Sequence, residues 1–481
     1  MSDIIYMRSD SVHPISSLTP EAFSAWLAET RARLLAVARQ SGTNLGHLDV
    51  ALTGDLRLLG VALLEEAAQA QAADIPWVCP QCQQPLHREA KRCGRHVTTT
   101  VGQVHLTRDY GWCSQCHQWH FPADARWGLH PKAPASPRVQ EMAAEAVLKM
   151  PCAEAEKSLP RLGGCPLSAT GLHREALRQG GRAQAIRQVD MDLTTTTQGV
   201  AQLSRQAQAP PKPFVLIIQM DAWNIRERDG WGESEALRKQ GQEPPRWHWV
   251  YTATLFRLDQ RGHTASQRPV ITERGYVATR AGLESFERQV YAEALRRGLG
   301  AAAEVLVVAD GAIWIWNLVE NRFRLATQRV DLYHVKQHLW SAANELYAQD
   351  KSQARAWLRP LFHQLERKND GAVQVLEALK ELLRAKESLT PAQREKLARE
   401  IGYFTTHAQR MDYAQGRRKQ QPVGSGAVES TCRQYQVRFK RAGQFWSLAG
   451  DESLLALETL NRNGRWRELF PHRNQSVAPA R

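Results

Sequence analysis

The spacing of apolar residues changes several times along the chain, and each change marks a segment of different predicted structure. Between residues 17 and 72 apolar residues recur at helical spacing, which predicts an N-terminal helical region over 1–74. Short β-like runs follow over 76–127, and helical spacing returns over 136–185. We therefore expect helices, then a small β-rich module, then helices again.

The second half of the chain has a different pattern. Residues 189–212 are rich in Thr, Gln and Pro and have little to bury, which predicts a linker. Short apolar runs and an amphipathic helix over 213–335 predict the first part of an α/β core, and 336–420 are predicted to be an almost wholly helical insertion. The last helices of the core are expected over 421–470, and a frayed tail over 471–481. The predicted fold class is multidomain α/β.

Cysteine spacing gives the β-rich module, which we place at 75–130, a candidate chemistry. Two C-x2-C knuckles pair Cys79 with Cys82 and Cys113 with Cys116. Four thiolates bind Zn²⁺ tetrahedrally, so the knuckles predict a structural zinc ribbon. A redox-active pair among small buried residues is the alternative. Three further side chains are substitute ligand candidates: Cys93, His117 and His120.

Residues 135–188 are predicted to form a helix-turn-helix. Three helices are expected at 137–149, 153–159 and 169–179, with a glycine turn before the last one. A third helix that carries basic side chains is typical of a helix that reads DNA, although a plain helical bundle has the same pattern. The candidate DNA contacts on it are His173, Arg174 and Arg178.

Charge and composition narrow the classes of partner. The chain has 63 Lys and Arg against 49 Asp and Glu, a formal net charge of +14. Such an excess favours a polyanionic partner, usually nucleic acid, although a basic surface can also serve solubility alone. No apolar run reaches the ~18 residues of a membrane span, and no signal-peptide pattern is present. We expect a cytoplasmic, nucleoid-associated protein whose eight cysteines stay reduced.

Two apolar runs of the α/β region end in an acid. Asp221 follows the run 214–220, and Asp310 follows 305–309. The carboxyl ends of neighbouring strands meet at one edge of a sheet, so both carboxylates could bind the same cations, as two-metal phosphoryl transfer requires. Glu429, in the first turn of a late helix, is the candidate third acid. Each acid alone also has a structural explanation, in a turn or at a helix start.

The late helix is basic as well as acidic. Arg433 and Lys440 share a helical face with Glu429, and Arg438 and Arg441 flank that face. A single acid among basic side chains suits a metal ligand beside a phosphate backbone. A solvated basic face is the alternative interpretation.

Several blocks of the sequence resemble bacterial insertion-sequence DDE transposases, in particular the ISKra-type group. The resemblance covers roughly residues 75–460, and its most specific part is DGAIWIWN followed by DLYHVKQHLW. The matching blocks are MDAW at 220–223, ADGAIWIW at 309–316, DLYH at 331–334 with HLW at 338–340, and GSGAVES at 424–430.

The resemblance implies a fold and a set of metal ligands. It implies an RNase H-like catalytic core interrupted by the helical insertion. Asp221 would lie on the first strand, Asp310 after the fourth, and Glu429 on the late helix. These three acids would hold two Mg²⁺ or Mn²⁺ ions, beside the structural Zn²⁺ of the ribbon.

The DLYH block resembles an element that supports the active site or contacts the transposon ends in related transposases. Asp331 and His334 are its candidates here, and His334 and Arg433 could contact the scissile or flanking phosphates. Three acids remain rivals for the metal site: Glu227, Asp229 and Asp331.

The implied activity is metal-dependent cleavage and joining of DNA. Water would attack a phosphodiester at a transposon end, and the released 3′-OH would then attack target DNA. The partners would be double-stranded DNA at the transposon ends and target, recognised by the ribbon and the helix-turn-helix, and further copies in a homodimer or larger assembly. The alternatives are a domesticated, non-catalytic DNA-binding protein or repressor, and an RNase H-like nuclease without strand transfer.

Overall fold

A computed structural model describes residues 19–131, 133–207, 212–228, 234–242, 247–347, 350–385 and 389–471. The chain forms two compact units, Met1–Ala176 with Phe470–Arg481, and Leu177–Leu469. Asp229, one of the rival acids, and the predicted tail from 472 onward lie outside the described residues. Each helix within the described ranges is too short or too polar to cross a bilayer.

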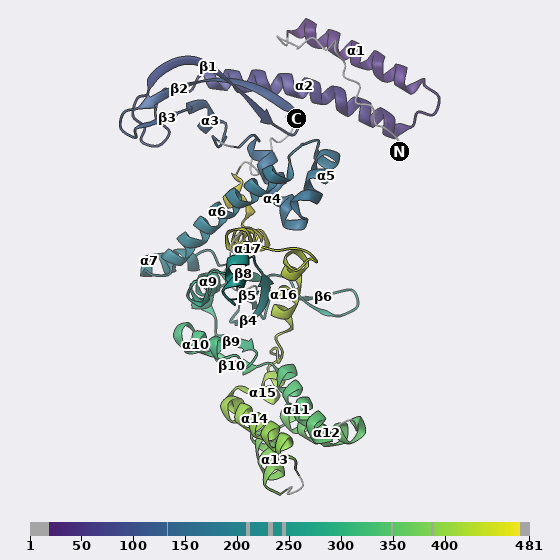
Figure 1. Ribbon diagram of the computed structural model, residues 1–481, viewed down its shortest axis with the longest axis vertical. Coiled ribbons are helices and arrows are strands. Elements are labelled where there is room, and N and C mark those ends of the chain that lie inside the picture. The colour runs from purple at the N-terminus through teal and green to yellow at the C-terminus, as the bar shows by residue number, and fades with distance from the viewer. Residues whose placement is uncertain are drawn as a thin grey trace. The chain divides into compact units, whose positions relative to one another are not determined.

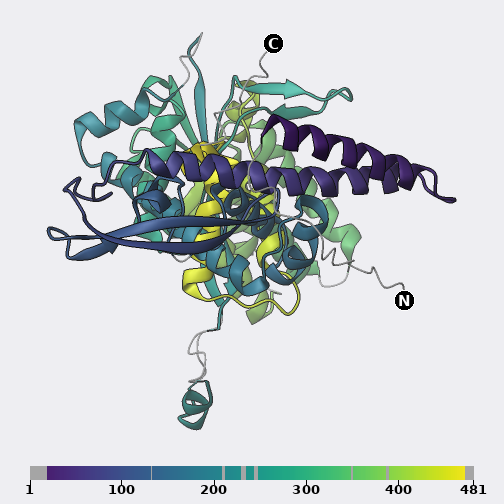
Figure 2. The same ribbon diagram turned by 90° about the horizontal axis from the view of Figure 1, so that it is seen from above.

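The first unit begins with a helical hairpin and a small antiparallel sheet. Helices α1 (Pro20–Ala38) and α2 (Leu45–Ala73) start at the capping side chains of Thr19 and Asn44. Strands β1 (His87–Thr98), β2 (Gln103–Cys113) and β3 (Gln118–His120) pair in that order. Helix α2 lies along this sheet (Figure 1 and Figure 2), because its partly buried apolar side chains cover the small apolar core of β1 and β2.

The helices predicted to follow the zinc ribbon region are present. A short helix α3 (Pro122–Arg126) precedes α4 (Pro137–Lys149), which Ser136 caps as its sequence suggests. Helix α5 (Cys152–Gly163) ends at Gly164, whose φ of 65° is a left-handed conformation that suits glycine. Helix α6 (Ala169–Leu193) is longer than the helix expected to end at 179.

The predicted linker is therefore largely helical. The end of α6 and the following α7 (Thr197–Ser204) occupy most of it. Leu193, Val200 and Leu203 pack against an apolar face of helix α9 (Leu283–Arg296), which gives this polar-looking segment something to bury. The sequence of the segment does not indicate this contact, because the apolar face that covers it belongs to α9, a later helix.

The second unit is built on a mixed sheet of five strands. These are β4 (Val215–Arg226), β5 (Trp247–Arg257), β8 (Gly275–Thr279), β9 (Glu304–Ala309) and β10 (Thr327–Val330). Their order is β10-β9-β4-β5-β8. Strands β4, β9 and β10 are parallel, whereas β5 is antiparallel to both of its neighbours.

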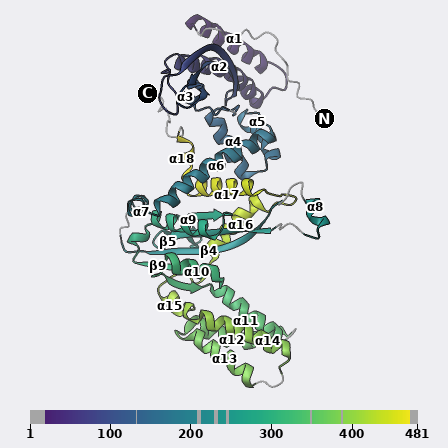
Figure 3. The ribbon, with the colours of Figure 1, turned by 60° about the vertical axis from the view of Figure 1, so that its left-hand side comes forward.

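Helices cover both faces of this sheet (Figure 3). Side chains alternate across a strand, so Leu216 and Ile218 of β4 join the main core with Phe286 of α9 and Ile315 of α10 (Ile313–Arg322). On the other face Ile217 packs near the start of α16 (Gly426–Phe439). Helix α17 (Leu448–Arg462) contacts β8. Smaller elements complete the unit: α8 (Ser234–Lys239), β6 (Arg261–His263), β7 (Pro269–Ile271) and α18 (Trp466–Leu469).

A helical bundle follows β10, where the insertion was expected. Helices α11 (Leu332–Tyr347), α12 (Lys351–Arg367), α13 (Gly371–Ala385) and α14 (Pro391–His407) pack on one another, and α15 (Tyr413–Arg418) leads back to the sheet. Their buried leucines continue the apolar core of the sheet without a break. The bundle begins a few residues before 336, directly after β10.

A buried arginine connects the end of the bundle to the sheet through an ion pair and hydrogen bonds. The Arg329 side chain on β10 is fully buried, and its Nε and Nη2 donate to the two carboxylate oxygens of Asp412, at 2.8 and 3.0 Å. Its Nη1 donates to the carbonyl oxygen of Pro422 at 3.0 Å. Such bidentate pairing compensates the cost of removing the guanidinium from water.

We predict that Arg329→Met lowers the free energy of unfolding by about 3 kcal/mol, because it leaves the Asp412 carboxylate without its partner. Urea denaturation followed by circular dichroism measures this change. Arg399→Met, which removes an exposed partner of Glu395, is the control and should change it by less than about 0.5 kcal/mol. Equal stability of the two variants would show that the Arg329 pair contributes little.

Candidate functional site

Two acids meet where the parallel pairing of β4 with β9 ends. Met220 pairs with Ala309 in the register of these strands, so Asp221 and Asp310, the next residues, are brought to the same edge. One oxygen of Asp221 accepts a hydrogen bond from its neighbour Ala222 N at 2.7 Å. Burial raises the pKa of Asp221, the backbone N–H of Ala222 lowers it, and the nearby charge of Asp310 raises it further. A half-buried carboxylate beside another carboxylate is an environment that favours a cation.

Asp331, at the end of β10, is held from two sides. Its Oδ1 caps α11 by accepting from the backbone N–H groups of Tyr333 and His334, at 2.5 and 3.0 Å. Its Oδ2 accepts from the backbone N–H of Ser425 and lies 2.7 Å from the Ser425 hydroxyl oxygen. Burial raises the pKa of Asp331, but the hydrogen bonds from His334 and Ser425 outweigh burial and lower it to about 2.

Glu429 completes this group from helix α16. The Ser425 hydroxyl oxygen lies 3.2 Å from Oε1 of Glu429, and thus between Glu429 and Asp331. Asp331, His334 and Glu429 each offer one ligand atom, and these atoms all lie within 4.8 Å of one another. This Asp–His–Glu group could hold a metal ion.

His334 connects the two pairs of acids electrostatically. Its Nδ1 lies 3.5 Å from Oδ1 of Asp331, and this interaction raises its pKa, while burial lowers it. The charges of Asp310 and Glu429 raise the His334 pKa further. The charges of these side chains therefore act on one another across the site: Asp221, Asp310, Asp331, His334 and Glu429. The ligand atoms that lie within 4.8 Å of one another belong to Asp331, His334 and Glu429.

Glu227 is not part of this arrangement, although it was a rival acid. It lies six residues beyond Asp221, is buried, and forms an ion pair with Arg280, whose Nη2 donates to Oε2 at 3.2 Å. Its charge is already compensated there, by an interaction that sequence spacing does not reveal.

Helix α14 of the bundle adds residues that the sequence did not indicate. A side chain at Gly311, next to Asp310, would meet Cε2 of Tyr403 at 2.7 Å, so the tyrosine ring lies directly against this turn. The ring stacks on His338 with centroids 3.7 Å apart, and Oε2 of Glu400 lies 2.7 Å from Nδ1 of His338. Burial raises the pKa of Tyr403, as do the charges of Asp310, Asp331 and Glu400. Its hydroxyl therefore stays protonated.

The candidate DNA-binding side chains lie on α6 and around α16. His173 and Arg174 are exposed on α6, and Arg178 is half-buried there. Arg433 is exposed on α16. The other basic side chains of this region lie over aromatic rings or are partly buried: Lys440 over Trp223, Arg438 over Trp446, and Arg441.

The four predicted zinc ligands come together in the first unit. The sulfur of Cys79 lies 3.8 Å from that of Cys116, and the sulfur of Cys82 lies 3.5 Å from that of Cys113. The four sulfurs form a second group that could hold a metal ion, and Cys93, His117 and His120 are not part of it. Burial raises the pKa of Cys79, but backbone N–H groups of Cys82 and Gln81 outweigh it and lower the pKa to about 7. Four sulfurs that lie this close together, one of them with a lowered pKa, fit Zn²⁺.

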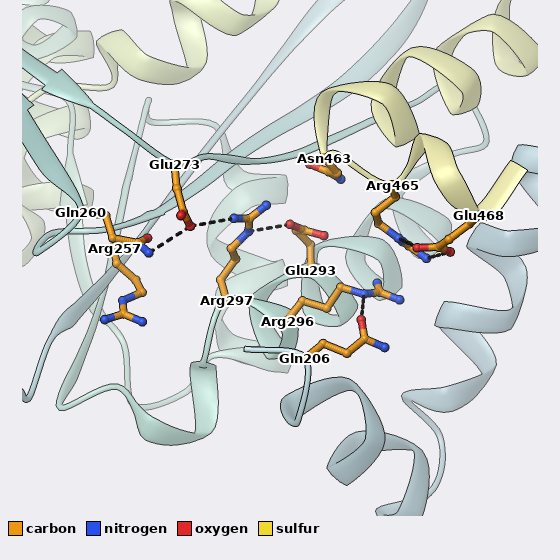
Figure 4. Close-up of a pocket in the computed structure, with 10 residues that line it drawn as sticks. All are labelled: Gln206, Arg257, Gln260, Glu273, Glu293, Arg296, Arg297, Asn463, Arg465 and Glu468. Carbon is orange, nitrogen blue, oxygen red and sulfur yellow. Dashed lines mark hydrogen bonds and ion pairs between the residues drawn. The ribbon is translucent and has the colours of Figure 1, made fainter. Parts of the chain in front are cut away.

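A polar pocket of about 220 Å³ lies elsewhere in the second unit (Figure 4). Its basic side chains are matched by acids: Nε of Arg297 lies 2.9 Å from Glu293, and Nε of Arg465 lies 2.6 Å from Glu468. Because these charges compensate one another, the pocket is an ion-pair network and does not compete with the carboxylate site as a metal or anion site.

Comparison with known proteins adds little. No family model and no curated protein matches the chain. Among solved structures, the chain is similar to the Drosophila P element transposase strand transfer complex, with 12% sequence identity and a TM-score of 0.30 over 68% of this chain and 92% of that chain. The neighbour is a transposase, but so weak a likeness carries no conclusion about this chain. The ISKra-type resemblance remains an expectation from the sequence.

We predict that the purified protein contains zinc bound by the four cysteines. Chelation should lower the melting temperature of the first unit, and Cys82→Ser should abolish stoichiometric zinc, as measured by atomic emission and by release to a colorimetric chelator. Cys93→Ser is the matched control and should keep its zinc. Absence of zinc in the wild type, with unchanged stability after chelation, would contradict the prediction.

A second prediction concerns Asp331 in metal-free protein. Its folded pKa of about 2 lies below the value of 3.8 for an unperturbed aspartate, so the ionised carboxylate stabilises the fold above about pH 4, and this contribution disappears as the pH falls toward 2. Asp331→Asn should therefore cost about 2 kcal/mol at neutral pH and progressively less in acid. Urea denaturation across this pH range measures it. Asp370→Asn, at an exposed position in the bundle, is the control.

Proposed function

We propose that this protein is a DNA transposase with an RNase H-like core, which uses metal ions at the carboxylate site to cut and join DNA. The observation that carries the proposal is the meeting of Asp221 and Asp310 at one sheet edge, within electrostatic reach of Asp331, His334 and Glu429. Clustered acids of this kind are costly to a fold that has no use for them, because they repel one another and resist burial.

The sheet supports this proposal. Among the five strands of the sheet, β4 comes first along the chain and lies at the centre, between β5 and β9. Strand β9 is the fourth of them in chain order, and Asp310 follows it directly. These are the positions that the sequence resemblance implies for the first two acids of an RNase H-like core. Glu429 lies in the first turn of α16, which packs on β4, as the resemblance implies for the third.

The donor set fits a hard divalent cation. Mg²⁺ and Mn²⁺ prefer carboxylate oxygens, which Asp221, Asp310 and Glu429 supply, and Asp331 can add one. The raised pKa of Asp221 reflects burial and the Asp310 charge, which a bound cation would compensate. Bound there, such ions would activate the attacking oxygen and stabilise the leaving oxygen of a phosphodiester.

The protein's own residues would position the DNA strand around these acids. The interaction with Asp331 favours the protonated imidazole of His334, which suits contact with a phosphate oxygen better than ligation of Mg²⁺. Arg433 is exposed on the same helix as Glu429 and could contact the neighbouring phosphate. Preorganised charges of this kind account for most of the acceleration in phosphoryl transfer.

Other parts of the chain would bind the DNA ends. The net charge of +14 provides affinity for a polyanion. The four-cysteine module and the helices α4, α5 and α6 would recognise the transposon ends, through phosphate contacts for affinity and base edges for sequence. Because an element has two ends, two or more copies would act together.

We predict that Asp310→Asn lowers the rate of Mg²⁺-dependent strand cleavage at the element's own ends by at least about 10²-fold, while the affinity for those ends changes little. The assay follows cleavage and joining of a labelled end duplex on denaturing gels, with binding measured separately by anisotropy. Asp370→Asn, at an exposed position in the bundle, is the control and should cleave as the wild type does.

Each other outcome of this assay favours a different function. Tight, specific binding by the wild type with no cleavage in Mg²⁺ or Mn²⁺ would favour the non-catalytic DNA-binding alternative. Cleavage that leaves only free ends, with no joined target, would favour a nuclease. Undiminished cleavage by Asp310→Asn would refute the role of Asp310.

A further inference from the structure

We propose that one face of the β4–β5 ribbon binds unpaired DNA bases by stacking them on Trp247 and Trp249. This inference deepens the proposed function and rests on it for the biological source of the strand, because cutting and joining expose unpaired nucleotides near the site. The binding itself can be tested without any cleavage.

The ribbon extends beyond the rest of the sheet. Strand β9 pairs with β4 only as far as Met220, and β8 pairs with β5 only from Tyr251 onward. Past these points β4 and β5 continue as a pair, with Asn224 opposite Trp249 and Arg226 opposite Trp247. This part of the ribbon therefore has no further strand of the five-stranded sheet beside it.

Two tryptophans lie exposed on one face of this ribbon. Trp247 and Trp249 are two residues apart on β5, so both side chains point to the same side, and they are 58% and 53% exposed. Exposing two large aromatic side chains next to each other is unfavourable in water, and such patches generally mark a binding surface. Flat aromatic rings at this spacing suit a flat apolar ligand.

Arginine side chains lie among aromatic rings on the same face. The guanidinium carbon of Arg226 lies 6.0 Å from the ring centroid of Trp247 and 4.5 Å from that of Phe445. The guanidinium carbon of Arg228 lies 4.5 Å from the ring centroid of Phe445. Glu227, which lies between these two arginines in sequence, pairs with Arg280 instead.

Cationic and aromatic side chains in alternation match single-stranded nucleic acid. The bases of such a strand can stack on aromatic rings, while its phosphates contact guanidinium groups. Paired bases in a duplex are already stacked and show only their edges, so a flat aromatic face favours unpaired bases. An apolar protein partner would gain nothing from Arg226 and Arg228, and charge thus favours DNA.

This face lies near the acids along β4, but on the other side of the sheet. Arg226 is five residues from Asp221, about 17 Å along an extended strand, and this odd spacing turns the two side chains to opposite faces. Asp221 accordingly lies beside Cys432 of α16. We infer that the face holds unpaired bases several nucleotides away from the phosphodiester that the acids would act on, on a strand that passes around the ribbon.

The test measures binding of the full-length protein to a labelled oligothymidylate of about 16 nucleotides and to a duplex of equal length, by fluorescence anisotropy. The double variant Trp247→Ala/Trp249→Ala should lose about 10-fold or more in oligothymidylate affinity, with little change for the duplex. Trp247→Phe/Trp249→Phe keeps aromatic faces and should restore most of the loss. Leu325→Ala removes another fully exposed apolar side chain and is the control.

Several outcomes would overturn this inference. Equal oligothymidylate affinity of the wild type and the double alanine variant would do so, as would no affinity of the wild type. A change in oligomeric state of the alanine variant, with unchanged DNA binding, would instead identify the face as a protein contact. Failure of the proposed function is distinguishable, because it would leave tryptophan-dependent oligonucleotide binding intact while cleavage remains absent.

Discussion

The parallel pairing of β4 with β9 is the interaction on which the candidate site depends. In each strand the paired apolar run is followed by an acid, and the register that sets Met220 beside Ala309 also brings Asp221 and Asp310 together. Both faces of β4 are apolar, but Gln219 accepts hydrogen bonds from the backbone at the start of α16, and a shift of one residue would turn it to the other face. These bonds therefore favour the register, and the register holds two carboxylates together despite their repulsion.

Asp331 is also buried next to other charges, but hydrogen bonds stabilise its ionised form. Asp221 has its pKa raised, whereas Asp331 accepts hydrogen bonds from the start of α11 and from Ser425 and has its pKa lowered to about 2. It thus joins β10, α11 and the residue before α16 through one buried carboxylate. Because Ser425 also lies beside Glu429, Asp331 helps to position that acid from a distance in sequence of almost 100 residues.

Sequence alone indicated the parts of the site whose signals are local. Apolar runs that end in Asp221 and Asp310 predicted strand ends; Asp310 does follow β9, whereas β4 continues past Asp221 to Arg226. The spacing of Cys79, Cys82, Cys113 and Cys116 predicted a group that the structure brings together. The position of Glu429 in the first turn of a late helix made it the candidate third acid, and the sequence resemblance added Asp331 and His334.

What sequence did not reveal depends on contacts between distant segments. Tyr403 reaches Gly311 only because the bundle folds back onto the sheet, and no spacing encodes that contact. The linker expected over 189–212 is mostly helical because α9 covers the apolar side chains of α7, and Asp190 pairs with Arg465. The sequence leaves Glu227 as a rival acid, but in the structure it forms an ion pair with Arg280. In each case the deciding partner lies tens to hundreds of residues away.

The long strand β4 connects the acids to the proposed stacking face without a hinge. It is paired continuously with β5 from Leu216 to Arg226, so Asp221 and Arg226 cannot move apart without breaking that pairing. A strand that passes around the ribbon from the stacking face to the opposite face would therefore meet the acids at a fixed distance from its stacked bases. Because the ribbon is rigid, the site needs no closure to position the strand. The number of nucleotides between the stacked bases and the acids would decide which phosphodiester lies over the carboxylates.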